Sequence, residues 1–397
     1  MRKIYLDNAA TTHLDARVKK AMAPYMGPVF GNPSSFHSMG KEADNAIEEA
    51  RKSVTNNLNC RPHEIVFCSG GTESDNLAIL GAARANREAG DHIMTTKIEH
   101  HAVLEPFHHL EKEEDFKVSY IGVGKNGIVN PKEIEKALTK KTILVSVMMA
   151  NNEIGTIQPI AEIGKIILKW RKKNKTKYPL FHTDACQAAG ALELNVEKLH
   201  VDLLTLNGSK IYGPKGVGVL YVRNFTKVAP LVFGGGQERG LRPGTENVAG
   251  IVGLAKAFEL AQKEKEKESK RLIKLRDYFI ASILKKVPDS CLNGDAKLRL
   301  PNNINISFLN VEGEAMILYL DAKGIYVSSG SACTSRTLDP SHVLLAAGVP
   351  AEAAHASVRF TLGKKTTKAD LDYVLRVLPL LVKKLREMSP TKFQYGK

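Results

Sequence analysis

The chain has 397 residues and a formal net charge of +15, from 57 Lys and Arg against 42 Asp and Glu. At roughly 100–200 residues per domain, this length predicts two domains, or three at most. Hydrophobic residues make up 43% and charged residues 25%, as in globular proteins, which excludes a disordered tail, a collagen and a small disulfide scaffold.

Membrane, secretion and metal signals are all missing from the sequence. No stretch approaches the ~20 consecutive apolar residues of a membrane span, and Asp7 precedes any apolar region of signal-peptide length. We therefore expect a cytoplasmic protein with no membrane partner. The cysteines are scattered without a CxxC pair, so we predict no disulfide framework and no metal site: Cys60, Cys68, Cys186, Cys291 and Cys333.

The basic excess could indicate a nucleic-acid partner or an acidic protein partner. The lysine run at 262–268, however, alternates with glutamates, which is typical of a solvated helix face. Without a focused basic stripe, we expect no direct nucleic-acid binding as the main function.

Short apolar runs alternate with amphipathic segments through the first two thirds of the chain. The runs are rich in Val, Ile and Leu without strict alternation, as in strands buried on both faces. Helical patterns at 73–86, 131–138 and 160–172 separate several of them, which predicts a mainly parallel sheet between helices. The seven predicted strands are 64–68, 92–95, 118–123, 143–149, 180–182, 203–206 and 217–222.

The pattern changes after about residue 250. A long charged helix is predicted over 255–286, followed by a strand at 303–308, a helix near 314–320 and a Ser/Gly-rich loop at 328–331. A strand at 357–362 and a helix at 368–387 close the chain. This α+β pattern predicts a second, smaller domain.

Three ends of predicted strands carry polar residues, and ligands of open α/β sheets bind at the carboxyl ends of strands. Ser69-Gly70-Gly71-Thr72 opens a helix and could bind a phosphate through backbone amides, or could be a tight turn. Asp184 could pair with a protonated heteroaromatic nitrogen, or could cap a helix. Lys210, between an apolar strand and a Gly-Pro turn, could form a Schiff base.

Together these residues meet the three needs of pyridoxal phosphate. The phosphate needs amides and hydroxyls, the ring nitrogen needs an acid, and the aldehyde needs an amine. The order of phosphate loop, acid and lysine is the order found in aminotransferase-like enzymes.

The sequence also resembles the NifS/IscS-type cysteine desulfurases, from its first residues to about Ser389. The motifs that carry the resemblance are YLDNAATT, GNPSSFH, SGGTESDN, IEH, NNEIGTIQP, HTDACQ, KIYGPKG, GGGQERGLRPGTEN and SSGSACTS. The resemblance implies the fold type I of pyridoxal-phosphate enzymes, with a large domain at 15–258. A small domain of 1–14 and 259–397 would carry the catalytic cysteine loop.

The resemblance also implies how the cofactor is held. Lys210 would form the Schiff base with pyridoxal phosphate, Asp184 would face the ring nitrogen, and Gln187 would bond the ring's phenolic oxygen. The phosphate would be bound by residues from two loops and, in a homodimer, by one residue of the neighbouring subunit: Gly71, Thr72, Asn207, Ser209 and Thr245.

For the substrate, the resemblance implies that Asn152, which also lies at the cofactor, and Arg359 bind the carboxylate of L-cysteine. Lys210 would move the Cα proton, and His100 would stack over the ring and assist deprotonation of the substrate thiol. Cys333, in the Ser/Gly loop, would attack the substrate sulfur, leaving L-alanine and a persulfide. Cys186 is the second choice of nucleophile.

Two features depart from the family pattern. Asn207 and Ser209 stand where a serine and a histidine are usual, which predicts weaker cofactor retention. The chain ends soon after Phe393, where many members carry a longer tail that docks an iron–sulfur scaffold, so scaffold docking stays open. We expect an acceptor protein in iron–sulfur cluster assembly or tRNA thiolation.

Alternatives on the same fold are an aminotransferase, a selenocysteine lyase and a kynureninase-like enzyme. None of these needs a sulfur-carrying cysteine in a Ser/Gly loop, although selenocysteine lyases also keep a related one. A non-catalytic basic protein that contacts tRNA is the alternative from another class. The presence of Lys210, Asp184 and Cys333 argues against it.

Overall fold

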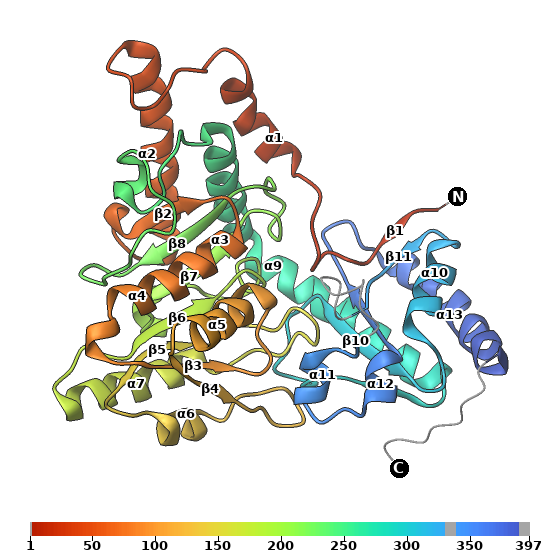
Figure 1. Ribbon diagram of the computed structural model, residues 1–397. Helices are drawn as coiled ribbons and strands as arrows, with labels where there is room; N and C mark the ends of the chain where they lie inside the picture. Colours follow the sequence, from red (N-terminus) through yellow and green to blue (C-terminus); the bar gives the residue numbers. More distant parts are fainter. Residues whose placement is uncertain (1, 330–338, 389–397) are drawn as a thin grey trace.

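The computed structural model describes residues 2–329 and 339–388, and its centre is a seven-stranded sheet (Figure 1). The strand order is β2-β8-β7-β6-β5-β3-β4, with β8 antiparallel to both of its neighbours and all other pairs parallel. This confirms the predicted mainly parallel sheet. The strands are β2 (Ile65–Cys68), β3 (His92–Thr96), β4 (Lys117–Ile121), β5 (Thr142–Ser146), β6 (Leu180–Asp184), β7 (Leu203–Asn207) and β8 (Gly218–Val222).

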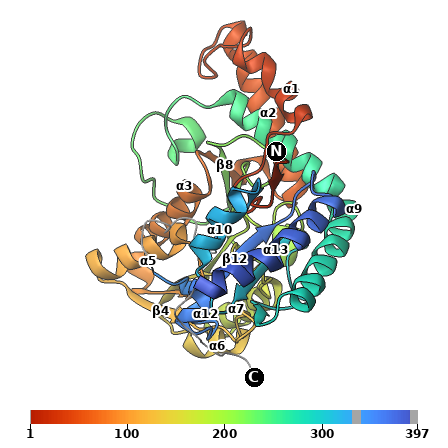
Figure 2. The ribbon, with the colours of Figure 1, turned by 90° about the vertical axis from the view of Figure 1, so that its right-hand side faces the viewer.

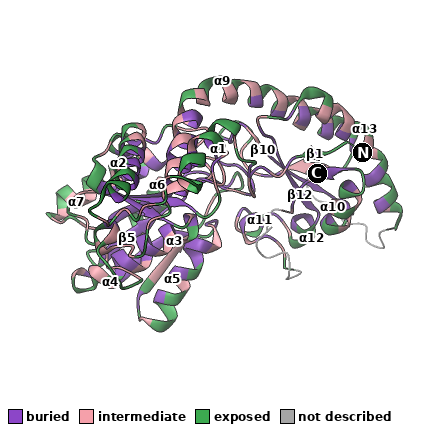
Figure 3. Ribbon diagram, turned by 90° about the horizontal axis from the view of Figure 1, so that it is seen from above, coloured by how far each residue is buried: buried purple, intermediate pink, exposed green. Residues whose placement is uncertain are grey.

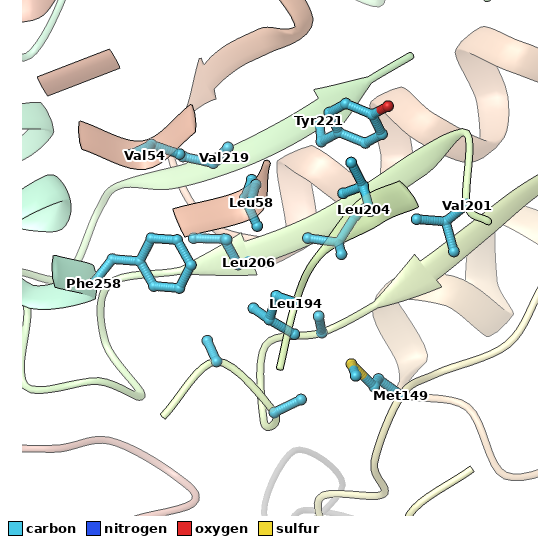
Figure 4. Packing of buried hydrophobic residues seen from close by; sticks show 14 of the residues in the cluster. Val54, Leu58, Met149, Leu194, Val201, Leu204, Leu206, Val219, Tyr221 and Phe258 are labelled. Carbon is cyan, nitrogen blue, oxygen red and sulfur yellow. The ribbon is translucent and has the colours of Figure 1, made fainter. Parts of the chain in front are cut away.

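Helices cover both faces of the sheet, because its inner strands are buried on both sides. One core joins the sheet to α2 and α9; Figure 4 shows Val54 and Leu58 of α2 and Phe258 of α9 against strand residues. A second core lies on the other face, under the segment 77–83 and α5. The helices of this part are α1 (Ala16–Met22), α2 (Ser38–Leu58), α3 (Gly71–Asn76), α4 (Ala82–Ala85), α5 (His101–Glu113), α6 (Pro131–Ala137), α7 (Ile160–Asn174) and α8 (Val196–Leu199).

A separate core lies around a three-stranded antiparallel sheet of order β12-β10-β9 and a parallel pair, β1 with β11. In Figure 2, α13 lies beside the long helix α9 at this end of the molecule. The elements are β1 (Ile4–Tyr5), β9 (Ser290–Leu292), β10 (Asn303–Phe308), β11 (Ile325–Tyr326), β12 (Ser357–Thr361), α10 (Gly313–Asp321), α11 (His342–Ala346), α12 (Ala351–His355) and α13 (Lys368–Met388).

Helix α9 (Val248–Lys286) connects the two ends of the molecule, as Figure 3 shows from above. Its first part packs on the core of the large sheet through Phe258, and its last part packs on the other core through Phe279. The predicted domain boundary after residue 258 falls inside this helix, and the division into two domains stays a prediction.

Most predicted elements differ from the observed ones by one or two residues at an end, and three differ more. Helix α9 begins seven residues before the predicted start, because the Asn247 side chain caps it by accepting the N–H of Gly250. Strand β5 ends at Ser146 instead of 149, and beyond this end the carboxyl group of Glu99 accepts the N–H of Met148. The predicted helix at 73–86 forms, but a π-helical stretch (Leu77–Gly81) separates α3 from α4.

Candidate active site

A cavity of about 560 Å³ opens at the carboxyl ends of the parallel strands. It brings together ten of the predicted site residues, from six separate segments of the chain: Gly71, Thr72, His100, Asn152, Asp184, Gln187, Asn207, Ser209, Lys210 and Arg359. Thr245 is exposed and is not part of this wall. Cys333 lies outside the described residues.

One end of the cavity is formed by backbone. Gly71 begins α3 directly after the turn that follows β2, so the first amides of the helix point toward the cavity. A Cβ atom on Gly71 would lie 2.8 Å from Sγ of Cys186 and 3.1 Å from Nδ2 of Asn207, so a larger residue would crowd these two side chains. Ser209 Oγ donates to Asn207 Oδ1 at 3.4 Å. Amides and hydroxyls in this arrangement suit a phosphate group.

An amine and a carboxylate lie further along the same wall. Asp184, at the end of β6, accepts the N–H of Cys186 through Oδ1 at 2.8 Å, a bond that uses only one carboxylate oxygen. Lys210 Nζ donates to the carbonyl of Ala10 at 2.5 Å, and Gln187 Nε2 donates to the carbonyl of Ala9 at 3.0 Å. The N-terminal segment therefore closes the cavity beside the lysine.

Buried ionisable groups lie under Asp184. The Asp75 carboxylate lies 3.6 Å from Nε2 of His182, and Ser146 Oγ lies 2.8 Å from its Nδ1. Burial lowers the pKa of His182 to about 3, so this imidazole is neutral. Burial and the nearby Asp184 raise the pKa of Asp75 well above its ordinary value, which favours its neutral form. Asp184 lines the cavity and can accept from a cationic group placed there.

His100 caps the N-terminus of α5. Its Nδ1 accepts the N–H of Ala102 at 3.1 Å. Burial lowers the pKa of His100, with Lys210 and two neighbouring histidines adding to the effect against the opposing charge of Asp184. The imidazole of His100 is therefore neutral at neutral pH.

Arg359 presents its guanidinium to the cavity from β12, in the other part of the molecule. Nη1 donates to the carbonyl of Asn152 at 3.0 Å and Nη2 donates to Asp7 at 2.9 Å. Its buried Nε has no hydrogen-bond partner among the described residues. An orphaned guanidinium donor beside a cavity suits a carboxylate ligand.

The four described cysteines are poor nucleophiles. Burial raises the pKa of Cys60 and Cys68 to about 12, and it also raises that of Cys291. Cys186 lines the cavity, but burial and the charge of Asp184 raise its pKa well above its ordinary value. Because the thiolate is the reactive form, none of these four is poised to attack a substrate.

Comparison with known proteins identifies the protein family. The family model "Aminotransferase class-V" matches residues 4–374, so the chain belongs to this family of pyridoxal-phosphate enzymes. Within it, the chain is 54% identical over 394 residues to cysteine desulfurase IscS of Dictyoglomus turgidum, covering 99% of this chain and 98% of the relative. It is 52% identical over 389 residues to IscS of Methanosarcina thermophila, covering 98% and 94%.

Solved structures of related proteins are also similar to this chain. A NifS-like protein superimposes with a TM-score of 0.90 at 39% identity, covering 97% of this chain and all of that one. SspA in complex with cysteine gives a TM-score of 0.77 at 33% identity, covering 91% and 99%. The chain is thus a NifS/IscS-type cysteine desulfurase family member, as the sequence motifs indicated.

Pyridoxal phosphate fits the cavity by its chemistry. The wall offers the three required groups together: a glycine-floored cluster of amides and hydroxyls, the Asp184 carboxylate and the Lys210 amine. Among the residues that the structure describes, there is no group of three or more His, Cys, Asp and Glu that could hold a metal ion. No helix within the same residues is long and apolar enough to cross a membrane.

Sequence reasoning missed several residues of the cavity region. Asp7 binds Arg359, and the Glu99 carbonyl accepts Nε2 of His342 at 2.9 Å. Ser341 Oγ donates to Glu153 Oε2 at 2.5 Å, so α11 begins against the cavity. Glu99 follows an apolar residue three positions after the end of β3, which is a usable signal. No sequence signal identifies His342, because its hydrogen-bond partner, Glu99, lies 243 residues away in the chain.

Proposed function

We propose that this protein converts L-cysteine to L-alanine and transfers the sulfur to its own Cys333 as a persulfide. The observation that carries the proposal is the cavity that gathers Lys210, Asp184, His100 and the guanidinium of Arg359. The stoichiometry is complete: one thiol and one cysteine give one persulfide and one alanine. The IscS and SspA relatives support cysteine as the substrate.

Arg359 orients the substrate. Two of its nitrogens are fixed on Asp7 and on the Asn152 carbonyl, so the plane of the guanidinium is set before substrate binds. The buried Nε then donates to the substrate carboxylate, and Asn152, at the same wall, adds a second contact.

Lys210 moves a proton. Pyridoxal phosphate, when bound, supplies an electron sink for the charge left on Cα. Nζ of Lys210 takes the Cα proton and returns it within the cofactor–substrate system, which is general acid–base catalysis. Asp184 would face the ring nitrogen of the bound cofactor and pair with it. Gln187 and the phosphate residues Gly71, Thr72, Asn207 and Ser209 hold the cofactor in place.

Cys333 accepts the sulfur. The four other cysteines have pKa values raised by burial, so a thiolate at neutral pH has to come from elsewhere in the chain. Cys333, in the sequence Ser331-Ala332-Cys333, is the remaining thiol. We propose that an acceptor protein in iron–sulfur cluster assembly or tRNA thiolation then takes the sulfur, in the cytoplasm.

A homodimer completes the site in this proposal. Large apolar side chains are exposed on two neighbouring segments: Met26, Phe30 and Phe36 on one, Val232 and Phe233 on the other. The segments meet where Pro33 and Gly236 line the same surface hollow. Large apolar side chains exposed on two segments that meet favour a subunit interface. Thr245, exposed beside it in sequence, would then reach the partner's phosphate site.

The test compares the wild-type protein with Cys333→Ala. With pyridoxal phosphate, L-cysteine and a reductant, the wild type should release alanine and sulfide in equal amounts. Cys333→Ala should keep the visible absorbance of the bound cofactor and release no sulfide, while Cys291→Ala should behave as wild type. Normal sulfide release by Cys333→Ala would refute the role of Cys333, and alanine formation without sulfur transfer would refute the reaction.

A further inference from the structure

One segment of the chain carries positive charge without any acid to balance it. Residues 163–183 contain seven Lys and Arg and no Asp or Glu. The segment covers most of α7, at the lower left of Figure 1, the turn after it and β6 up to the residue before Asp184. In the run at 262–268, by contrast, glutamates alternate with the lysines, and Glu264 pairs with Arg17 and Lys364. The positive charge of the chain is therefore concentrated at α7.

The lysines of this segment face solvent. Lys165, Lys169 and Lys172 are three or four positions apart, so they form a row along one side of α7. Ile163 and Ile167 pack the other side of the helix into the core of the large sheet. Among the residues that the structure describes, no ion pair is formed by any of the six exposed lysines of the segment: Lys165, Lys169, Lys172, Lys173, Lys175 and Lys177.

Two more lysines lie at the same edge of the sheet. Strand β6 follows the segment, and β5 follows Lys140 and Lys141, which are both exposed. The two strands are parallel neighbours, so the residues before them share the amino edge of the sheet. The cavity opens at the opposite, carboxyl edge. We call these eight exposed lysines the basic surface: Lys140, Lys141, Lys165, Lys169, Lys172, Lys173, Lys175 and Lys177.

Two acids at the amino edge already have partners. Asp202, directly before β7, is buried and pairs with Arg171, the one arginine of the segment. Asp91, directly before β3, pairs with Lys117 at 3.3 Å. Neither acid is paired with a lysine of the basic surface, so the charge of this surface is left for a ligand.

The chemistry of the basic surface suits a row of phosphates. A nucleic-acid duplex carries one negative charge per about 1.7 Å of its axis, and lysines that neutralise phosphates release counterions. An ammonium on a flexible side chain contacts a phosphate as a point charge, whereas base edges are commonly read by the planar fork of arginine. Because Arg171 is bound to Asp202, the surface fits contacts that do not depend on base sequence.

The aromatic residues of the segment favour a duplex over a single strand. Trp170 and Tyr178 are half-buried and pack against the two cores of the large sheet, and Phe181 is fully buried. Single-stranded bases bind proteins largely by stacking on exposed aromatic rings. The segment offers no such ring, so its contacts are with the backbone of a double helix.

A protein partner fits this surface less well. Lysine is depleted at protein interfaces, whose central part is apolar and often aromatic. Every residue of α7 is described, and Leu168, at 42% exposure, is its one exposed large apolar side chain. The surface therefore has the charge for a polyanion but lacks the apolar centre of a protein interface.

We propose that the basic surface binds the phosphate backbone of a double-helical nucleic acid, either DNA or an RNA stem, independently of base sequence. Bound in this way, the enzyme keeps its cavity open to substrate, because the cavity lies at the opposite edge of the sheet. The interaction goes beyond the function proposed above and does not depend on it.

The test is fluorescence anisotropy of labelled DNA and RNA duplexes of mixed sequence, titrated with the full-length protein between about 50 and 200 mM KCl. The wild type should bind, with an affinity that falls as salt rises. The triple variant Lys169→Gln, Lys172→Gln and Lys173→Gln should bind at least about tenfold more weakly at the lowest salt. On DNA, its slope of log K against log salt should be shallower by about 2–3, since each phosphate contact contributes about 0.9.

The matched control is the triple variant Lys263→Gln, Lys267→Gln and Lys270→Gln on α9. It removes the same charge from exposed lysines of a helix, but from outside the basic surface, so it should bind like the wild type. Both triple variants should keep the Tm and the rate of alanine formation of the wild type, because none of the six residues lines the cavity.

The outcomes separate the possible ligands. Tighter binding of one duplex identifies DNA or RNA as the preferred polyanion, and either result supports the proposal. Equal affinities of the two triple variants, or a wild type that binds neither duplex at the lowest salt, overturn it. Polyglutamate that binds as tightly as the duplexes also overturns it and assigns the surface to an acidic protein. A wild type that binds duplexes but forms no alanine from L-cysteine refutes only the proposed function.

Discussion

Replacing Arg359 with lysine tests how the cavity recognises its substrate. The Arg359 side chain is 3% exposed and spans Asp7 and the Asn152 carbonyl, with Nε left for the ligand. A lysine ammonium is a single point charge and cannot keep both anchors while donating to a carboxylate. Hydrogen bonds to charged groups contribute about 1.5–3 kcal/mol each. At about 1.4 kcal/mol per tenfold, Arg359→Lys should lower kcat/KM for L-cysteine by about 10–150-fold.

The loss should appear mainly in KM, because the guanidinium holds a group that does not react. The assay is initial-rate alanine formation across L-cysteine concentrations, with cofactor content measured by absorbance. Arg276→Lys is the matched control: Arg276 is also a buried arginine, but it donates to the carbonyls of Arg299 and Leu300, away from the cavity. This control should lower stability and leave KM unchanged. A KM for Arg359→Lys within twofold of wild type would refute the reasoning.

Three further predictions concern stability, cofactor binding and assembly. Burial raises the pKa of Glu99 to about 8 from 4.5, so wild-type folding loses stability between these pH values, by at most about 1.4 kcal/mol per pH unit. The Tm of Glu99→Gln relative to wild type should therefore rise from pH 5 to pH 8 in scanning fluorimetry; a constant difference would contradict this. Gly71→Ala should weaken pyridoxal phosphate binding about tenfold in absorbance titrations, since overpacking costs about 1–3 kcal/mol. Gly122→Ala, outside the cavity and with nothing within 4 Å of its Cβ, should bind normally, and equal affinities for the two variants would count against the crowding argument. Phe233→Glu should shift the protein to monomers in light scattering. Leu318→Glu, which also places a charge on an exposed apolar site, should leave the dimer intact. If both variants remain dimers, the apolar patch is not part of the interface.

The sequence predicted local structure well where one segment carries the whole signal. The strand at 303–308 has the predicted bounds as β10, and all seven strands of the large sheet were identified. Their runs of Val, Ile and Leu reflect burial on both faces, which is visible in composition. Strand ends were less accurate because contacts from distant residues, such as Glu99 with the N–H of Met148, occur there and leave no mark in composition.

For the site, the sequence by itself determined the chemical groups: an amine, an acid and a glycine-rich turn, each at the end of its own strand, and Cys333 as the proposed sulfur carrier. Only the tertiary structure decided how these groups are oriented. The fold places the Ala10 carbonyl on Lys210 and Asp7 on Arg359. It also brings His342 to the carbonyl of Glu99, a contact that a linear pattern does not pair. The physical reason is that composition and spacing record which groups are buried, whereas the orientation of a group depends on contacts between distant segments.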